Sequence, residues 1–374
     1  MMIKFFQIIF YYLIKMSSIK TILVTGGLGY IGSHTVVELF NKEYLKENKV
    51  KNEYDVVIVD DCSTCSEKVL AILENMVGKE IPFYKVSIVN KKDLEEAFKN
   101  HKFYAVIHFA GKKAVNESVE KPLFYYENNF VGTLNLIELC LKYKVNNFIF
   151  SSSCTVYGSR DDKPKEDEKM LFPINPYGRS KLFIEYMLKD TAKVEKDFKI
   201  ALLRYCNPVA AHPSGKIGED PLLKPINLFP VIQNLVRGTL KEMKIFGKDY
   251  PTKDGACIRD YIHVTDIAQG HIIVLNAFEK DNEKLFNENT VIYNMGTNKG
   301  YSVKEVIETY EKTNGIKLNY TYGEKRNGDA AIALPECSKI KNELGWIPKI
   351  GLEQMCKDSY NFVKMHPNDY IMND

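Results

Sequence analysis

The first half of the chain alternates short apolar runs with longer amphipathic stretches. The apolar runs lie at 21–25, 56–60, 105–109, 148–152 and 200–204. They are nearly continuous, which is typical of strands that are buried on both faces of a parallel sheet. The stretches between them carry helical periodicity, most clearly at 32–40, 131–144 and 177–189. This βαβα order predicts a doubly wound α/β domain with right-handed crossovers.

The second half is less regular. Residues 207–230 are rich in proline and glycine and predict an extended loop region. Short mixed elements follow, with a predicted strand at 291–295 and a predicted helix at 303–312. We therefore expect a smaller mixed α/β domain after the parallel sheet. The expected ranges are an unstructured extension at 1–18, a sheet domain at 19–206 and a second domain at 207–374, from which a segment such as 260–300 could return to the first.

The N-terminus contains a largely apolar run at 5–14, with Lys4 in front of it. A signal peptide has such a charged part and such an apolar part, but no small-residue cleavage site follows here. The run is shorter than the ~20 residues that a membrane-spanning helix requires, so we expect no membrane partner. A targeting segment and an unstructured extension both stay open. The second is favoured because the first strand starts at about Lys20.

The charge and the cysteine content argue against a nucleic-acid-binding protein, a disulfide-rich protein and a zinc protein. The 51 basic and 48 acidic residues are scattered and give a net charge of +3, so nucleic acid is not an expected partner. Eight cysteines are too few for a disulfide framework in a chain of 374 residues. Cys62 and Cys65 form a Cys-x-x-Cys pair, but the second pair that a zinc site needs is missing. We interpret both as ordinary thiols kept reduced in the cytoplasm, and we expect no metal.

A glycine-rich segment, TGGLGYIG, directly follows the first predicted strand. Gly26 permits a tight turn, Gly29 lets the backbone approach a pyrophosphate, and Gly32 lets the next helix pack on the strand. The free N–H groups and the positive dipole end of that helix then face the phosphates. The segment therefore predicts a Rossmann-type dinucleotide site.

The second predicted strand ends at Asp60. A carboxylate there can accept both ribose hydroxyls and would repel the 2′-phosphate of NADP, so NAD is the expected cofactor. Asp60 lies further from Gly32 than the usual ~20 residues. We attribute the excess to a polar insertion around 42–54. The alternative is a strand-end carboxylate that faces water.

The segment NPYGRSK places Tyr177 and Lys181 four residues apart at the start of a predicted helix. Asn175 suits the N-cap and Pro176 the first turn, and the i,i+4 spacing puts both functional side chains on one face. A Tyr-x-x-x-Lys pair is common by chance. Its significance lies in the order along the chain, because the glycine turn and the serines at 151–153 precede it.

The free energy that Lys181 can contribute to the ionisation of Tyr177 can be estimated. A phenol of pKa ~10 needs about 4 kcal/mol of preference for phenolate to titrate near neutral pH. An ammonium at ~4 Å supplies about 1 kcal/mol in bulk water and ~4 kcal/mol at the effective dielectric of a protein site. Lys181 can therefore activate Tyr177 only where water is largely excluded, with a cationic nicotinamide helping. Ser153 can donate to, or relay the proton of, the same substrate hydroxyl.

With these motifs in place, the sequence resembles the extended short-chain dehydrogenase/reductase family, and within it the enzymes that epimerise C4 of UDP-sugars. The resemblance runs from about Lys20 to Asn368. It is carried by VTGGLGYIGSHT, VIHFAGKKAVNESVEKPLFYYENN, FIFSSSCTVYG, NPYGRSK, ALLRYCNP, AHPSGKIGEDP, IFGKDYPTKDG and RDYIHV. It implies NAD-dependent interconversion of UDP-glucose and UDP-galactose through a transient 4-keto sugar, carried out by a cytoplasmic homodimer.

Position by position, the resemblance implies that Tyr177 is the acid/base, Lys181 binds the nicotinamide ribose, and Ser153 hydrogen-bonds the reacting oxygen. Beside these three, the residues implied to bind NAD are Gly26, Gly29, Tyr30, Ile31, Gly32, Asp60, Asp61, Cys62, Ser63, Thr64, Cys65, Ser87, Ile88, Phe109, Ala110, Gly111, Lys112, Lys113, Asn128 and Cys206. Those implied to line the UDP-sugar site are Ser153, Tyr177, Asn207, Asn227, Leu228, Lys244, Ile245, Phe246, Arg259, Arg326, Asp329 and Ala333. Arg259 and Arg326 suit a diphosphate clamp, and their alternative is a pair of surface salt bridges.

A few positions depart from the family pattern. Ser87 stands where an acid commonly contacts adenine, Cys206 replaces a Phe beside Asn207, and Ala210 replaces a Gly. These changes remove no catalytic group, but they weaken the expectation of tightly held NAD. Ala333 stands where the family carries either a bulky Tyr or a small residue near the C2 substituent of the sugar. We hypothesise that it leaves room for an N-acetyl group, which would add UDP-GlcNAc and UDP-GalNAc as substrates.

Other functions stay open at this point. A UDP-pentose 4-epimerase or a 4,6-dehydratase would use the same redox chemistry. Dehydratases of this fold need an acid beside the serine, where this chain has Cys154 and Thr155. A catalytically inactive NAD sensor would keep the glycine turn and lose the Tyr/Lys pair, which this chain retains. Conversion of UDP-galactose without added reductant and without net NADH separates the three.

Overall fold

The computed structural model describes residues 19–160, 162–220, 225, 227–279, 284–325 and 329–368. The extension predicted at 1–18 and the candidate residue Arg326 lie outside this described part. None of the helices within it combines the length and the apolar character that crossing a bilayer requires.

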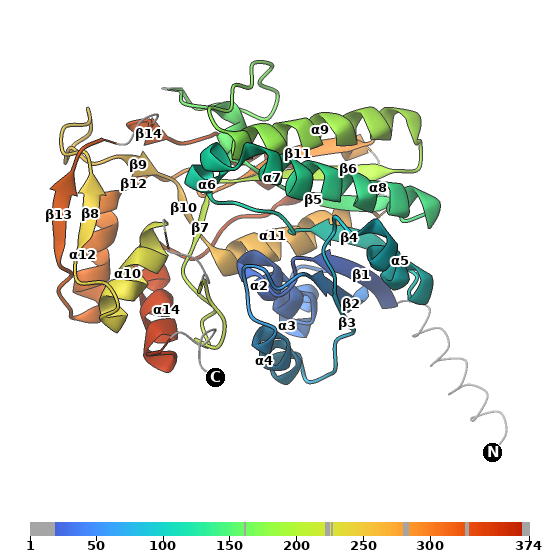
Figure 1. Ribbon diagram of the computed structural model, residues 1–374, viewed down its shortest axis with the longest axis horizontal. Helices are drawn as coiled ribbons and strands as arrows, with labels where there is room; N and C mark the ends of the chain where they lie inside the picture. Colours follow the sequence, from blue (N-terminus) through green and yellow to red (C-terminus); the bar gives the residue numbers. More distant parts are fainter. Residues whose placement is uncertain are drawn as a thin grey trace.

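A seven-stranded sheet forms the centre of the larger unit, in the order β11-β6-β5-β4-β1-β2-β3 (Figure 1). All neighbouring strands pair in parallel. The strands are β1 (Ile19–Thr25), β2 (Glu53–Asp60), β3 (Phe83–Lys85), β4 (Ala105–His108), β5 (Asn147–Ser153), β6 (Lys199–Tyr205) and β11 (Thr290–Met295). The order 3-2-1-4-5-6 is that of a dinucleotide-binding sheet, whose ligands bind where the strand order reverses, between β1 and β4. The predicted fold class is confirmed.

Helices cover both faces of this sheet (Figure 1). Alternation along β1 sets the two faces, because Ile22 and Val24 belong to one apolar core and Leu23 to the other. One face carries α2 (Tyr30–Leu39), α3 (Lys42–Glu47), α4 (Lys68–Val77) and α11 (Val264–Ala277). The opposite face carries α5 (Lys91–Asn100), α8 (Gly132–Lys142) and α9 (Pro176–Val194). Both faces are therefore buried, which explains the nearly continuous apolar strands.

Shorter helices connect these layers near the carboxyl ends of the strands. After β4 the chain forms α6 (Val115–Glu120) and α7 (Pro122–Tyr125), followed by a π-helix, η1 (Tyr126–Val131). A 3₁₀ helix, η2 (Cys154–Tyr157), follows β5 directly. These segments pack against α9 and against one another, so they fix the rim above the sheet.

A smaller unit is formed by the later part of the chain and lies beside the large sheet (Figure 1). Its apolar core includes Ile232, Met243, Tyr310 and Met355, which are all buried. Its strands pair as β7 (Asn207–Val209) with β10 (Tyr261–His263), β8 (Met243–Phe246) with β13 (Tyr320–Gly323), and β9 (Ile258–Arg259) with both β12 (Tyr301–Ser302) and β14 (Ile332–Ala333). Its helices are α10 (Leu228–Arg237), α12 (Val303–Asn314) and α14 (Leu352–Met365), with α13 (Ser338–Leu344) packed between α11 and β11.

Most predicted elements agree with the structure, and two differ. The polar insertion contains a helix, α3, because Tyr44 and Leu45 are buried against the sheet core. The loop predicted to reach residue 230 ends earlier, because α10 begins at Leu228. The strand predicted at 291–295 is present and pairs with β6 in the large sheet, in line with the expectation that a segment within 260–300 could return to the first domain.

Candidate functional site

The glycine turn lies at the carboxyl ends of β1 and β4. Gly26 has a φ of +70°, and a Cβ on it would lie 2.6 Å from the backbone nitrogen of Ala110. A Cβ on Gly32 would lie 2.1 Å from the carbonyl oxygen of Gly26. Gly29 is the N-cap of α2, so the free N–H groups of that helix open onto the turn. The roles predicted for the first and third glycines therefore match the packing.

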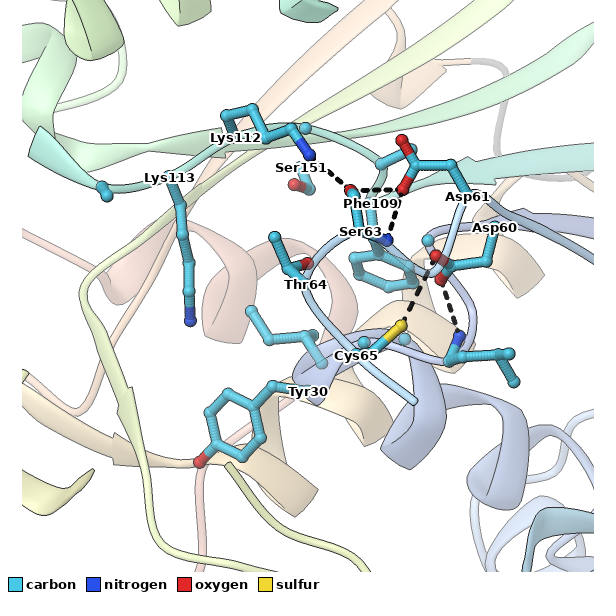
Figure 2. Close-up of a pocket in the computed structure, with 18 of the residues that line it drawn as sticks. Tyr30, Asp60, Asp61, Ser63, Thr64, Cys65, Phe109, Lys112, Lys113 and Ser151 are labelled. Atoms are coloured by element: carbon cyan, nitrogen blue, oxygen red, sulfur yellow. Dashed lines mark hydrogen bonds between the residues drawn. The ribbon is translucent and has the colours of Figure 1, made fainter. Parts of the chain in front are cut away.

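A cavity extends from this turn to the start of α10. Figure 2 shows Lys113 and Tyr30 on one side of it and Asp60 and Cys65 on the other. The predicted cofactor residues that line it are Gly26, Gly29, Tyr30, Ile31, Gly32, Asp60, Asp61, Ser63, Thr64, Cys65, Ile88, Phe109, Ala110, Gly111, Lys112, Lys113, Asn128, Tyr177 and Lys181. The strand ends and α9 thus bring together side chains that are up to about half of the chain apart in sequence.

Asp60 is buried in the wall of this cavity. Its carboxylate accepts hydrogen bonds from the backbone N–H of Leu28 (3.1 Å) and of Cys62 (2.9 Å). Burial raises the pKa of Asp60, and these two hydrogen bonds oppose the rise. The alternative of a carboxylate facing water is wrong for this residue, which is 7% exposed. An ionised carboxylate has about four lone-pair sites, which leaves acceptors for ribose hydroxyls.

Charged side chains cross the mouth of the cavity. The Lys113 ammonium lies 2.6 Å from a carboxylate oxygen of Glu219, and the Asn227 side chain donates to the same oxygen at 3.3 Å. On the opposite rim, the Ser63 hydroxyl donates to Asp61 and accepts from Lys112 (Figure 2). The ion pair of Lys113 ties the loop after β4 to Glu219, in the segment between β7 and α10.

The start of α9 follows the predicted capping pattern. The Asn175 side chain accepts a hydrogen bond from the backbone N–H of Gly178 at 2.8 Å, with proline at the first helical position. This cap fixes the start of the helix, whose first two turns carry Tyr177 and Lys181 on the side of the cavity. The Lys181 ammonium lies 6.0 Å from the centre of the Tyr177 ring.

Burial governs the electrostatics of this pair in the protein alone. It raises the pKa of Tyr177, opposed by a hydrogen bond with Ser153, and it lowers the pKa of Lys181 to about 8. The expected activation of Tyr177 also required a cationic nicotinamide, so it stays a prediction. The Lys181 ammonium donates to the carbonyl oxygen of Ser151 at 2.7 Å.

Four residues predicted to bind the cofactor do not line the cavity: Cys62, Ser87, Ser153 and Cys206. Ser153 ends β5 directly behind Tyr177, where its hydroxyl oxygen accepts from the Thr155 backbone N–H at 3.2 Å. The Cys206 sulfur instead lies 4.0 Å from that of Cys154 and 3.9 Å from that of Cys337. Cys206 thus belongs to a thiol cluster behind the cavity wall.

The predicted substrate residues divide between two places. Asn227 lines the cavity, whereas Asn207, Leu228, Lys244, Ile245, Phe246, Arg259, Asp329 and Ala333 do not. Arg259 and Ala333 are opposite one another in the β9–β14 pair. The Arg259 guanidinium also lies 3.1 Å from the Asp329 carboxylate, so these three form one group. Lys244 and Phe246 alternate with the buried Ile245 along β8.

The structure adds cavity residues that the sequence interpretation missed. Tyr125 lines the cavity, and its hydroxyl lies within hydrogen-bond distance of two acceptors, the carbonyl oxygen of Ala114 (2.8 Å) and the Glu117 carboxylate (3.0 Å). Glu117 and Glu219 line it as well. All three lie inside segments that carried the family resemblance, but no spacing pattern marks them, so only proximity in the fold identifies them.

The strand order, the buried acid at the end of β2 and the Tyr/Lys pair on α9 define the class of short-chain dehydrogenases/reductases. A family model described as GDP-mannose 4,6 dehydratase matches residues 23–359. The chain is 46% identical to a UDP-glucose 4-epimerase of Haemophilus influenzae, over 93% of this chain and 99% of that protein. The chain belongs to this family of sugar-nucleotide enzymes, on the branch that contains the UDP-glucose 4-epimerases.

Solved structures agree with this assignment. The crystal structure of a UDP-glucose 4-epimerase from Bifidobacterium longum in complex with NAD+ and UDP superimposes with a TM-score of 0.85 at 41% identity, covering 94% of this chain and all of that one. A UDP-Glc/GlcNAc 4-epimerase from Campylobacter jejuni superimposes with a TM-score of 0.77 at 36% identity, covering 92% and 99%. The likeness extends over the sheet unit and the smaller unit together.

Proposed function

We propose that this protein is an NAD-dependent epimerase that interconverts UDP-glucose and UDP-galactose at C4. The observation that carries the proposal is the placement of Tyr177 and Lys181 on the first turns of α9, beside the glycine turn and inside a cavity that reaches the start of α10. A base at this point can act on a sugar whose nucleotide extends toward the smaller unit. The relatives with this geometry are UDP-glucose 4-epimerases.

The residues of the cavity fit NAD. The backbone at Gly26 and Gly32 is packed so closely that a Cβ would collide with it, which is the close approach a pyrophosphate site needs. Asp60 offers a buried carboxylate to ribose hydroxyls, and Phe109 and Ile88 add apolar walls. NAD, when bound, supplies the hydride acceptor and donor for C4 of the sugar.

In the reaction we propose, Tyr177 acts as phenolate and removes the proton of the C4 hydroxyl while C4 gives up its hydride. The resulting 4-keto sugar turns while its UDP stays bound, and Tyr177 returns the proton once C4 has received the hydride on the opposite face. Ser153 holds the phenol oxygen by the hydrogen bond that already opposes the rise in the Tyr177 pKa. Because Lys181 alone leaves that pKa raised, we expect Tyr177 to be active as a base only when a cationic nicotinamide is present.

The smaller unit would hold the nucleotide. Arg259 offers a fork of N–H donors on β9, and its present partners, Asp329 and the carbonyl oxygen of Ala330 (2.9 Å), orient it. We expect Asn227 and Leu228 to face the diphosphate from the N-terminus of α10, where backbone N–H groups are available. Lys244 to Phe246 on β8 and Arg326 complete the set that we propose for the UDP-sugar.

Elimination is the less favoured alternative. The residues after Ser153 are Cys154 and Thr155, and the Thr155 hydroxyl donates to the Ser153 oxygen at 3.0 Å. This place therefore carries a thiol and a hydroxyl rather than the carboxyl group that removal of water would use. We expect epimerisation and no dehydration of the sugar.

The substrate range is the second part of the proposal. Ala333 is exposed on β14 beside Arg259 and Ile332, so a small side chain stands next to the proposed diphosphate clamp. We propose that UDP-GlcNAc and UDP-GalNAc are also epimerised, as the name of the Campylobacter jejuni relative states for that enzyme.

The test of this range is Ala333→Tyr. We expect its turnover of UDP-GalNAc to fall by about 10- to 100-fold because the phenol ring would occupy the space of the N-acetyl group. UDP-galactose turnover should stay within a factor of about two. Equal losses on both substrates, or no UDP-GalNAc turnover by the unchanged protein, would contradict the proposed range.

We propose a homodimer that packs through the helices above the sheet. Large apolar side chains are exposed together on α7, α8 and α9, among them Leu123 (81% exposed), Leu134, Phe183 and Tyr186. Exposed large apolar side chains on several helices of one layer are typical of an interface. A monomeric mass in solution at micromolar concentration would contradict it.

We place the protein in the cytoplasm. The Cys206 sulfur lies 4.0 Å from that of Cys154 and 3.9 Å from that of Cys337 without a disulfide, and all eight cysteines are free thiols. Thiols so close persist where the surroundings are reducing.

The experiment that tests the proposed function is an assay of purified protein with UDP-galactose, without added reductant. We expect an equilibrium mixture of UDP-glucose and UDP-galactose, and no net NADH absorbance. Accumulating NADH would indicate a dehydrogenase, and a dehydrated 4-keto product would indicate the elimination reaction. Binding of NAD without turnover would indicate a sensor.

A further inference from the structure

Three cysteines and an aspartate from distant parts of the chain meet behind the wall of the cavity. Cys154 begins η2, Cys206 follows β6, Cys337 precedes α13, and Asp260 lies between β9 and β10. The donor atoms of Cys206, Asp260 and Cys337 all lie within 4.8 Å of one another. Cys337 and Asp260 are buried, and Cys206 and Cys154 are partly exposed.

The sulfur spacing suits a single metal ion. Tetrahedral zinc with Zn–S bonds of about 2.3 Å separates neighbouring sulfurs by about 3.8 Å. The Cys206 sulfur lies 4.0 Å from that of Cys154 and 3.9 Å from that of Cys337. The Cys206 and Cys337 sulfurs and the Asp260 carboxylate need only small shifts to reach a common ion. Cys154, which meets this group through Cys206, would need a larger shift.

Residue 296 is a glycine that lies against the three donors and leaves no room for a side chain. A Cβ on Gly296 would lie 2.4 Å from the Cys206 sulfur, 2.9 Å from the Cys337 sulfur and 2.7 Å from a carboxylate oxygen of Asp260. These distances are too short for ordinary contacts, so the donors would have to move to admit a side chain. Any larger residue at position 296 would therefore disturb the arrangement of the three donors.

The Asp260 carboxylate is already oriented. It accepts hydrogen bonds from the backbone N–H of Thr297 (2.9 Å) and of Asn298 (2.9 Å), and from the Thr297 hydroxyl (2.7 Å). Ligating carboxylates are commonly held by such outer hydrogen bonds. The buried negative charge of Asp260 also favours a cation among the thiols.

We propose that Cys154, Cys206, Cys337 and Asp260 form a site for one thiophilic divalent cation of the zinc class, and that its occupancy inhibits the epimerase. As each sulfur–metal bond forms, the thiol loses its proton to the buffer, so no oxidant or reductant is required. Inhibition rests on the proposed function. We expect inhibition because Cys154 is next to Ser153 and Cys206 is next to Asn207 in the chain. A bound ion would hold these two segments of the substrate site against the loop before α13.

A second group, Asp60 with Cys62 and Cys65, also places donor atoms within 4.8 Å of one another. It has one sulfur fewer, and in the NAD-bound protein we expect the Asp60 carboxylate to be engaged by the cofactor. The experiment must distinguish the two groups.

The experiment is a titration of the full-length, NAD-bound, fully reduced protein with Co²⁺, followed by displacement with Zn²⁺. We expect one equivalent to bind with the strong visible absorption of a tetrahedral thiolate site. Gly296→Ala displaces the donors without removing one, and Cys337→Ser removes a donor outside the catalytic machinery. Each should weaken binding by a factor of about 10 to 100. The matched control is Cys356→Ser, a buried thiol on α14, which should bind like the unchanged protein.

Turnover of UDP-galactose is then measured without metal and with one equivalent of Zn²⁺. We expect Zn²⁺ to inhibit the unchanged protein and to spare Cys337→Ser, whose metal-free turnover should be normal. An absent thiolate spectrum, unchanged binding in both Gly296→Ala and Cys337→Ser, loss of binding in Cys65→Ser only, or full turnover of the metal-loaded protein would overturn the proposal. If the metal-free protein has no turnover, the proposed function fails, while the cobalt spectrum still decides whether the site exists.

Discussion

The two halves of the proposed active site are built in different ways. The cofactor half, which comprises the glycine turn, Asp60 and the start of α9, is formed where consecutive parallel strands end at one edge of the sheet. The substrate half, which comprises β8, β9, β14 and the start of α10, is assembled from strands of two to four residues. In the first, each functional side chain adjoins a long, buried strand. In the second, partners such as Arg259 and Asp329 are 70 residues apart.

The cofactor half therefore carries the residues proposed for the reaction, and the substrate half carries those proposed to bind the UDP-sugar. The rigid sheet fixes the base and the cofactor, while the short strands hold the nucleotide and the sugar. Changes in the cofactor half should therefore affect proton transfer, NAD affinity or stability. Changes in the substrate half should affect the affinity for UDP-sugars and leave bound NAD unchanged.

The largest expected effect lies in the cofactor half, at the proposed base. In Tyr177→Phe, kcat should fall by about 10²- to 10⁴-fold because the phenol that exchanges the C4 proton is lost. The Kd of UDP should change little, as measured by calorimetry. The matched control is Tyr186→Phe, a half-exposed tyrosine on the same helix. Near-normal turnover in Tyr177→Phe would remove the basis of the mechanism.

The next effect concerns stability. Burial lowers the pKa of Lys181 to about 8 from its ordinary 10.5, so the folded protein holds the charged form at a cost of about 3 kcal/mol. That cost is fully present below pH 8 and disappears between pH 8 and 10.5, because the folded state releases the proton before the unfolded state does. Lys181→Met should therefore be more stable than the unchanged protein at pH 7, by a margin that narrows toward pH 10.

Urea unfolding of both proteins at pH 7 and pH 10 measures this margin. The control comes from the other half, where Lys244→Met replaces an exposed lysine on β8. A margin for Lys181→Met that is constant or grows with pH would contradict the assignment of the buried ammonium.

A smaller effect is expected for the ribose contact. Asp60→Asn should weaken NAD binding by about 10- to 100-fold, since a hydrogen bond to a charged group contributes about 1.5–3 kcal/mol. Cofactor retained after gel filtration measures this, and UDP affinity should not change. Asp61→Asn removes an exposed carboxylate that accepts a hydrogen bond from Ser63, and this variant is expected to lose less NAD than Asp60→Asn. Full NAD content in Asp60→Asn would show that the acid does not hold the cofactor.

The smallest effect tests the substrate half. Arg259→Met should raise KM for UDP-galactose about tenfold, because one charged contact to the diphosphate is lost. Its kcat should stay within a factor of about two, and its NAD content should not change. A fall in kcat with KM unchanged would mean that Arg259 belongs to the chemistry rather than to recognition.

More of the cofactor half than of the substrate half could be predicted from the sequence, because the cofactor half is built from local patterns. The long strands, the glycine turn and the cap of α9 are local patterns, and the structure contains each of them at the predicted place. The edge strand β3 was missed because it has three residues and no full apolar run. The strand at Thr290–Met295 was predicted, but its pairing with β6 depends on contacts across the fold.

Side-chain groups made by the fold alone could not be predicted from spacing. A search for paired cysteines found Cys62 and Cys65 and missed the cluster of Cys154, Cys206 and Cys337, whose members are 52 and 131 residues apart. The ion pair of Lys113 with Glu219 spans 106 residues and has the same origin. The raised pKa of Tyr177 could not be predicted either, because it depends on how deeply the fold buries the phenol.

The central claim, that C4 loses a hydride and regains the same one, can be tested with UDP-galactose that carries deuterium at C4. The purified protein is incubated with this substrate in ordinary water, without added NADH, and the product is analysed by NMR. The account predicts UDP-glucose that retains the deuterium at C4, because the label remains in the active site until it returns to the opposite face of the sugar. Loss of the label to solvent would contradict the account, since it would show that inversion proceeds by proton exchange at carbon.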